Sequence, residues 1–221
     1  MQYIIYDLEF TVQRKQHQIA EIIEIGAVRV KETDGTAAIV DTFQTFVKPT
    51  KQPTLTPSTV SFTGIKQEDV AGAPQFREAV KAFTEWIGEE DYYLCSWGPD
   101  DKMQLLRQTR ELQMELDWIR NHNNLQSQYS RMINPEVYKQ VGLKRALEIE
   151  EIVLQGQQHR ALDDAYNTAQ VFVKRYSTFR LEKNLASEEL LYSTELVYSE
   201  GEASHNPFGA LAKLLDTGTS S

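Results

Sequence analysis

The chain opens with the stretch Gln2-Tyr3-Ile4-Ile5-Tyr6-Asp7-Leu8-Glu9, which decides the fold. The residues before the first acid are mostly β-branched or aromatic, as is typical of a short buried strand. Residues two apart in a strand project to the same side, so Asp7 and Glu9 can face one pocket at the strand's end. Two ionised carboxylates that close need cations between them. The alternative is a solvated strand end, because acid pairs are common.

Two more strands are expected directly after this one. A polar loop at 11–18 leads into a strand-like run at 22–30, and Asp34-Gly35 is a hairpin turn into a further strand between 38 and 47. Three antiparallel strands follow from this pattern.

The middle of the chain alternates helix and strand. Prolines punctuate residues 49–57, and 61–65 fits a loop or a short turn of helix. Apolar residues recur at helical spacing from 74 to 88, before a buried strand at 92–97 and a second helix that opens at Gly98-Pro99. This order is a βαβα unit. Cys95 is expected to be a small apolar residue of the buried strand rather than a nucleophile.

The last third is less regular at its start. Between 117 and 138 the sequence is polar, and Met132-Ile133 is the one plausible strand core. Patterned elements follow at 143–154 and at 160–180, where apolar residues keep to one face of a helix.

Composition favours one ordinary globular domain with an appendage. The chain has 221 residues, 41% of them hydrophobic, and a single cysteine, so no disulfide framework is expected. Neither a transmembrane stretch nor a signal peptide is recognisable, which predicts a cytoplasmic protein without a membrane partner.

The net charge of −9 argues at first against a nucleic-acid partner. It is unevenly spread, however: residues 1–101 carry −7, residues 102–183 carry +3 and residues 184–221 carry −5. Without the last segment the chain stands at −4. Two divalent cations held by four carboxylates would neutralise it. The charge therefore disfavours binding to a broad surface of a nucleic-acid duplex. It permits binding of the end of a nucleic-acid strand through metal ions.

Further acids stand at the starts of helices. Asp100 and Asp101 follow the strand at 92–97, and Asp163 and Asp164 come soon after His159. Taken alone, such acids are typical of helix caps and first turns, and a lone histidine in a polar loop is typically solvated. Their joint order is more informative than any single residue.

Several longer motifs accompany these acids. Besides Asp7-Leu8-Glu9, they are Glu21-Ile22-Ile23-Glu24-Ile25-Gly26-Ala27-Val28, Phe62-Thr63-Gly64-Ile65, Ser96-Trp97-Gly98-x-x-Asp101, Gly142-Leu143-Lys144 and His159-Arg160-Ala161-Leu162-Asp163-Asp164-Ala165-x-Asn167-Thr168-Ala169. As a set, these motifs resemble those of the DEDDh 3′-to-5′ exonucleases. The resemblance covers residues 1 to about 180 and is greatest to the branch with the sporulation-inhibitor KapD proteins and the Eri-type exoribonucleases. One departure is Gln158, where the branch often has a second histidine.

This resemblance implies a fold and a set of roles. The expected fold is an RNase H-like α/β domain, with a mixed five-stranded sheet of three antiparallel strands plus parallel strands, flanked by helices. Its cofactors would be two divalent cations, Mg²⁺ or Mn²⁺, which suit an all-carboxylate site. Asp7 would bridge both ions and His159 would be the general base. The implied metal ligands are Asp7, Glu9, Asp101 and Asp164.

The resemblance also implies contacts with the substrate. Phe10, Thr11, Phe62 and Ile65 would touch the terminal nucleotide by stacking and backbone approach. For Phe62 and Ile65 the alternative is core packing beneath the proline-rich loop. Asp100 and Asp163 are left with capping or helix-surface roles.

The expected activity is removal of nucleotides from the 3′ ends of single-stranded nucleic acid, with RNA preferred to DNA. Two alternatives stay open: a DNA-directed exonuclease, including a proofreading subunit, and a non-catalytic regulator that binds nucleic acid or protein. The expected domains are an exonuclease domain at 1–183 and an acidic, weakly structured tail at 184–221. A short apolar segment of that tail, 206–215, could dock on a protein partner through Phe208, Leu211, Leu214 and Leu215 or pack on its own domain.

Overall fold

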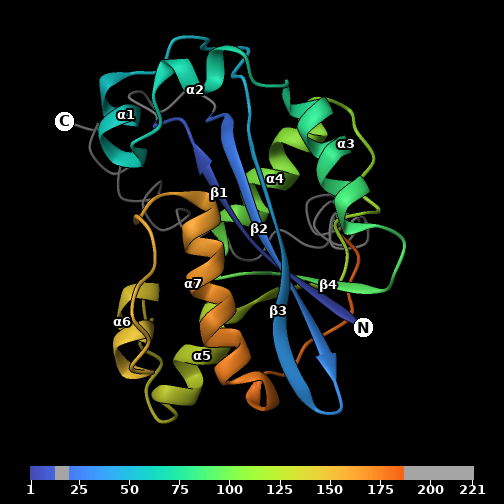
Figure 1. Cartoon of the computed structure of the whole chain (residues 1–221), viewed down its shortest axis with the longest axis vertical. Helices are drawn as coiled ribbons and strands as arrows, with labels where there is room; N and C mark the ends of the chain where they lie inside the picture. The colour runs from blue at the N-terminus through green and yellow to red at the C-terminus, as the bar shows by residue number, and fades with distance from the viewer. Residues whose placement is uncertain (13–19, 187–221) are drawn as a thin grey trace, which may run out of the picture. The chain divides into compact units, whose positions relative to one another are not determined.

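A central sheet of five strands organises the molecule (Figure 1). The computed structural model describes residues 1–12 and 20–186. The strands are β1 (Gln2–Phe10), β2 (Ile22–Thr33), β3 (Thr36–Phe46), β4 (Tyr92–Ser96) and β5 (His122–Asn124), in the order β3-β2-β1-β4-β5. β1 pairs antiparallel with β2 and parallel with β4, β2 pairs antiparallel with β3, and β4 pairs parallel with β5. The mixed sheet of the RNase H-like prediction is confirmed.

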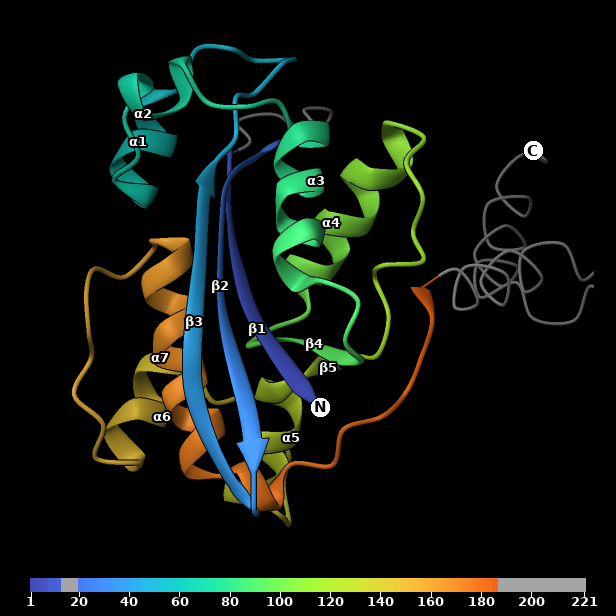
Figure 2. The same ribbon diagram turned by 45° about the vertical axis from the view of Figure 1, so that its right-hand side comes forward.

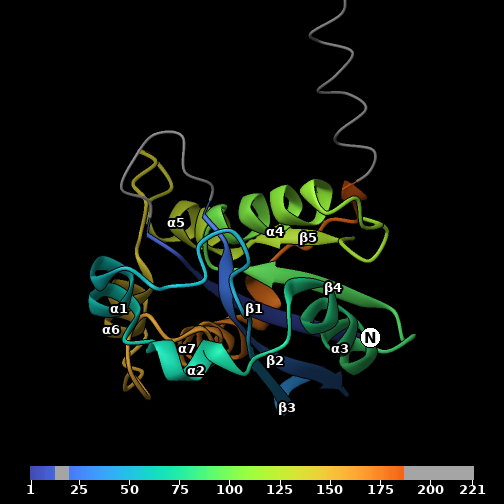
Figure 3. The ribbon, with the colours of Figure 1, turned by 90° about the horizontal axis from the view of Figure 1, so that it is seen from above.

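Helices cover both faces of this sheet, with α3 and α4 on one side and α5, α6 and α7 on the other (Figure 2). α1 and α2 lie near the end of the sheet toward which β1 runs, where α7 begins (Figures 1 and 3). The helices are α1 (Pro57–Thr63), α2 (Gln67–Ala71), α3 (Phe76–Ile87), α4 (Asp100–Glu111), α5 (Leu125–Ile133), α6 (Leu143–Ile149) and α7 (Ala161–Lys174), with a 3₁₀ turn η1 (Tyr176–Thr178).

Alternation along β1 builds the two core layers. Ile4, Tyr6 and Leu8 pack with α3 and α4, while Tyr3 and Ile5 pack with α5, α6 and α7. Continuing this alternation places the two acids of β1 on the α7 face. The acids therefore belong to the side of the sheet on which the helix with Asp164 lies.

The prediction of a strand at Met132-Ile133 was wrong. These residues end α5, and the fifth strand is His122–Asn124 instead. That strand is short, polar and at the sheet edge, so apolar periodicity could not reveal it. Side-chain amides stabilise it: Asn121 donates to the Tyr92 carbonyl, and Asn184 donates to the His122 carbonyl and accepts from the His122 N–H.

Other element boundaries shift by smaller amounts. The Asp34-Gly35 turn and the helix expected at 74–88 are present, but α6 ends at Ile149 and α7 at Lys174, earlier than predicted. Contacts continue past residue 183, since Ala186 is buried and its N–H donates to the Ile119 carbonyl. Within the described residues, no helix is long and apolar enough to cross a membrane. The apolar segment 206–215 lies outside the described part of the chain.

Candidate active site

The first two acids lie in the last part of β1, the central strand. Glu9 is 6% exposed and stands opposite Glu24 of β2, and Asp7 stands opposite Gly26. β1 runs past the end of its partner β4, because their pairing stops at Ile5 with Cys95. The end of β1 is therefore open on that side to groups that follow β4.

Asp101 occupies this opening. It lies in the first turn of α4, directly after β4, and its Oδ1 accepts the Leu8 N–H at 3.1 Å. The side chain is 8% exposed, which fits a carboxylate tied to the strand rather than a solvated helix cap. Asp100, the first residue of α4, faces solvent. The two adjacent acids thus differ in the structure: Asp101 is bonded to β1, and Asp100 is exposed.

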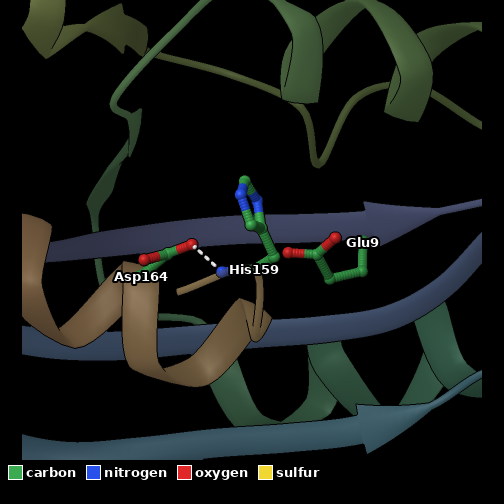
Figure 4. A group of neighbouring side chains, drawn as sticks. All are labelled: Glu9, His159 and Asp164. Atoms are coloured by element: carbon green, nitrogen blue, oxygen red, sulfur yellow. Dashed lines mark hydrogen bonds between the residues drawn. The ribbon is translucent and has the colours of Figure 1, made fainter. Parts of the chain in front are cut away.

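His159 lies in the loop just before α7, and Asp164 lies in the first turn of this helix. The backbone N–H of His159 donates to Asp164 Oδ2 at 2.9 Å, and the backbone of His159 is in the left-handed region, at φ 62° (Figure 4). Possible ligand atoms of Glu9, His159 and Asp164 all lie within 4.8 Å of one another. Asp163 instead accepts the Gln157 N–H at 2.8 Å and supports the loop before the helix.

Burial and mutual repulsion shift the acids' pKa values upward. Burial raises the pKa of Asp7 well above its usual range, and the charges of Asp101 and Asp164 raise it further. Burial is also the main cause that raises the pKa of Glu9 to about 8 and that of Asp101 to about 7. The pKa of Asp164 is raised by burial, although the His159 N–H opposes this shift. The charges of these four acids therefore act on one another.

Such a cluster fits divalent cations. Arg160 offsets part of the charge on Glu9, yet the pKa of Glu9 still rises. Carboxylate oxygens are ligands that Mg²⁺ and Mn²⁺ prefer, and the positive charge of such an ion would relieve the repulsion. This set of oxygen and nitrogen donors therefore fits the metal ions that the resemblance implies.

The four expected substrate contacts differ in their surroundings. Phe62 is 55% exposed, and its ring lies 4.2 Å from that of His159, centroid to centroid. Phe10 is half-buried at the end of β1, and the Thr11 hydroxyl accepts the Glu21 N–H at 3.0 Å. Ile65 is fully buried in a small core cluster. Phe62 thus adjoins the site, whereas the side chain of Ile65 packs in the core.

The sequence indicated no role for the buried residue Glu24. Glu24 is fully buried in β2 and accepts hydrogen bonds from Arg160, from Gln44 and from the Ala161 N–H. The signal in the sequence was a charged residue inside the apolar run Ile22-Ile23-Glu24-Ile25. A buried charge in a strand calls for a partner, but the sequence alone does not name it.

The fold and the acidic site together define an RNase H-like nuclease. The Exonuclease family model (RNase T) matches residues 4–172. The chain belongs to this exonuclease family, and the domain is a 3′-to-5′ exonuclease of the DEDDh type, a hydrolase.

Relatives of known sequence and structure agree with this assignment. The probable 3′-5′ exonuclease KapD of Bacillus subtilis is 27% identical over 173 residues, which are 76% of this chain and 82% of that protein. The PolC-type DNA polymerase III of Thermotoga maritima is 29% identical over 167 residues, 76% of this chain. The aligned region is only 11% of that polymerase's length.

A solved structure also supports the assignment to the DEDDh exonucleases. The nuclease domain of 3′hExo, a DEDDh family member bound to rAMP, superposes with a TM-score of 0.71 at 27% identity. The superposition covers 83% of this chain and 96% of that domain.

Proposed function

We propose that the protein is a metal-dependent 3′-to-5′ exonuclease of single-stranded ends, and that it prefers RNA to DNA. The observation that carries this proposal is the convergence of Asp7, Glu9, Asp101, Asp164 and His159 from three separate elements on one acidic cluster. A module that only binds nucleic acid has no need of a complete set of acids with a base.

In this proposal the four carboxylates hold two divalent cations, Mg²⁺ or Mn²⁺. When bound, the ions lower the pKa of a water and offset the charge that develops on the phosphate. Glu9 and Asp101 are buried, and Asp7 and Asp164 are half-buried. The Leu8 N–H fixes Asp101, and the His159 N–H fixes Asp164.

His159 serves as the general base. Its side chain is exposed beside Glu9 and Asp164, so its imidazole can reach a water and accept the proton that the water loses. The backbone bond to Asp164 couples the position of the base to that of a proposed metal ligand. Phe62, next to the imidazole, offers an exposed aromatic face on which a terminal base can stack.

Two kinds of relatives bear on the choice of nucleic acid. The 3′hExo domain has bound rAMP, and a related 3′-exonuclease, with a TM-score of 0.73 and 25% identity, recognises a histone mRNA stem-loop. These favour RNA. The PolC-type polymerases favour the second candidate function, a DNA-directed or proofreading exonuclease.

A digestion assay distinguishes the candidates. Matched single-stranded RNA and DNA of one sequence, labelled at the 5′ end, are incubated with the protein and Mg²⁺ or Mn²⁺. We expect stepwise shortening from the 3′ end, faster for RNA, and none with Asp7→Asn. Faster digestion of DNA would contradict the RNA preference and favour a DNA-directed exonuclease. No digestion of either strand, with unchanged binding by Asp7→Asn, would leave a non-catalytic binding protein.

Two further expectations belong to the proposal. We place the activity in the cytoplasm, and we propose a protein partner for the tail segment around Phe208 to Leu215. Deleting residues 200–221 should abolish binding of that partner and spare nuclease activity. Unchanged binding after the deletion would remove the tail from the proposal.

A further inference from the structure

A buried ion pair beside the site holds the segment that carries two of the proposed site residues. Glu24 Oε2 accepts from Arg160 Nε and from the Ala161 N–H, each at 3.2 Å, and Glu24 Oε1 accepts from Arg160 Nη2 at 3.2 Å. Arg160 is the N-cap residue of α7 and makes no side-chain cap. A carboxylate from β2 therefore takes the place of a helix cap.

The same strand also contacts the backbone of the first turn of α7. A Cβ atom built on Gly26 would lie 2.1 Å from the Leu162 N and 2.2 Å from the Ala161 carbonyl carbon. The backbone of α7 thus rests directly on β2, two residues along from Glu24. Because directly opposite residues of antiparallel strands share a face, the Glu24 side chain also lies on the same face as Glu9.

His159 immediately precedes Arg160, and Asp164 follows it by one helical turn. Both residues approach Glu9 within the 4.8 Å group. Any shift of the segment at Arg160 relative to β2 would move His159 and Asp164 away from Glu9 together. The contacts of Glu24 and Gly26 are what oppose that shift.

We propose that Glu24 and Arg160 are a positioning pair that sets His159 and Asp164 against Glu9 for metal binding and catalysis. This inference rests on the proposed function for its catalytic part. Its metal-binding part concerns the geometry of the acidic cluster, which can be measured without turnover.

The alternative is a pair that only stabilises the fold, and the chain offers a matched control for it. Glu150 is also buried and bound to an arginine: Arg175 Nε donates to it at 2.9 Å, as does the Tyr129 hydroxyl. Arg175 caps the opposite end of α7. Glu150→Gln therefore weakens a comparable ion pair far along the helix from His159.

The test compares Glu24→Gln, Arg160→Gln and Glu150→Gln in the full chain. Mn²⁺ affinity is measured by titration calorimetry, and kcat and KM are measured on a single-stranded RNA. Simple through-space electrostatics predicts opposite effects, since loss of an acid weakens cation binding and loss of an arginine strengthens it. A positioning pair predicts that both variants bind Mn²⁺ more weakly.

We expect Mn²⁺ affinity and kcat to fall about 10- to 100-fold in Glu24→Gln and Arg160→Gln, with a smaller change in KM and near wild-type values in Glu150→Gln. Tighter or unchanged Mn²⁺ binding by Arg160→Gln would overturn the inference, as would an equal loss in Glu150→Gln. Arg160 is partly exposed, so its variant keeps the test valid if Glu24→Gln does not fold. A wild-type protein that binds Mn²⁺ but digests nothing would refute the proposed function and leave the metal-binding comparison decisive.

Discussion

At the scale of the residue, the acids of the site combine two opposite demands. Burial and mutual repulsion make their ionised forms costly to the folded chain, but the ionised forms are the ones that bind cations. If the acids bind cations as proposed, the site lowers the stability of the metal-free fold in exchange for that binding. Removing the charge of one of these acids should therefore stabilise the metal-free fold.

Asp101→Asn should stabilise the metal-free protein at pH 8. The pKa of Asp101 is about 7 in the folded chain against an ordinary 3.8, so the folded chain loses stability as pH rises from about 4 to about 7, and the loss is complete at pH 8. Asparagine keeps the acceptor for the Leu8 N–H. We expect a gain of about 1 to 3 kcal/mol in the free energy of unfolding in EDTA at pH 8, and none below about pH 3, where Asp101 is protonated in both states.

Urea unfolding across this pH range measures the effect. Adding Mg²⁺ should stabilise the wild type and have less effect on Asp101→Asn, because a bound ligand stabilises only the state that binds it. A variant less stable than the wild type in EDTA at pH 8 would contradict this account of the cluster.

Phe62 offers a second prediction at this scale. Truncating its exposed ring with Phe62→Ala should weaken binding of single-stranded RNA about 10-fold, because stacking on one base is worth about 1 to 3 kcal/mol. Fluorescence anisotropy in an Asp7→Asn background measures binding without turnover. Val40→Ala on β3 is the control, since Val40 is also about half exposed, at 53%. Equal affinities of Phe62→Ala and the control would remove Phe62 from the substrate contacts.

At the scale of the element, β2 and α7 are held together by backbone contact. Gly26→Ala would place a methyl group against the first turn of α7. We expect a loss of about 1 to 3 kcal/mol in stability from this overpacking, together with weaker metal binding. Gly72→Ala is the matched control, because no atom lies within 4 Å of its added Cβ. Chemical denaturation measures the free energy of unfolding of both variants. A Gly26→Ala protein as stable as the wild type would mean that α7 can move off the strand at little cost.

The elements also show what the sequence could and could not predict. The hairpin at Asp34-Gly35 and the βαβα order were predictable because they depend on local turn chemistry and on the periodicity of apolar residues. The choice of Asp101 over Asp100 as a metal ligand came from the resemblance to the family and stays a prediction. β5 was not predictable, since the side-chain amides of Asn121 and Asn184 hold it rather than an apolar pattern. The role of Glu24 depends on Arg160, 136 residues away along the chain, so no local pattern could name the pair.

At the scale of the whole molecule, the pH dependence of stability is the sum of groups whose pKa values shift in opposite directions. The raised pKa values of Glu9 and Asp101 favour folding as pH falls. His122 acts the other way. Its ring is buried beside Tyr6 and Ser96, and burial, followed by the charge of Lys102, lowers its pKa from 6.5 to about 3.

In His122→Gln, the free energy of unfolding should therefore decrease less steeply as pH falls below 6.5. Below pH 6.5 the unfolded wild type binds a proton that the folded wild type does not bind until about pH 3. The contribution of His122 is thus complete above pH 6.5 and falls by about 2 to 4 kcal/mol as pH decreases to 4. Thermal or urea unfolding of both proteins from pH 8 to 4, in EDTA, gives the difference between two curves, in which the carboxylates common to both cancel. That difference should shrink steadily below pH 6.5, and parallel curves would show that His122 takes up its proton in the folded state as readily as in the unfolded chain.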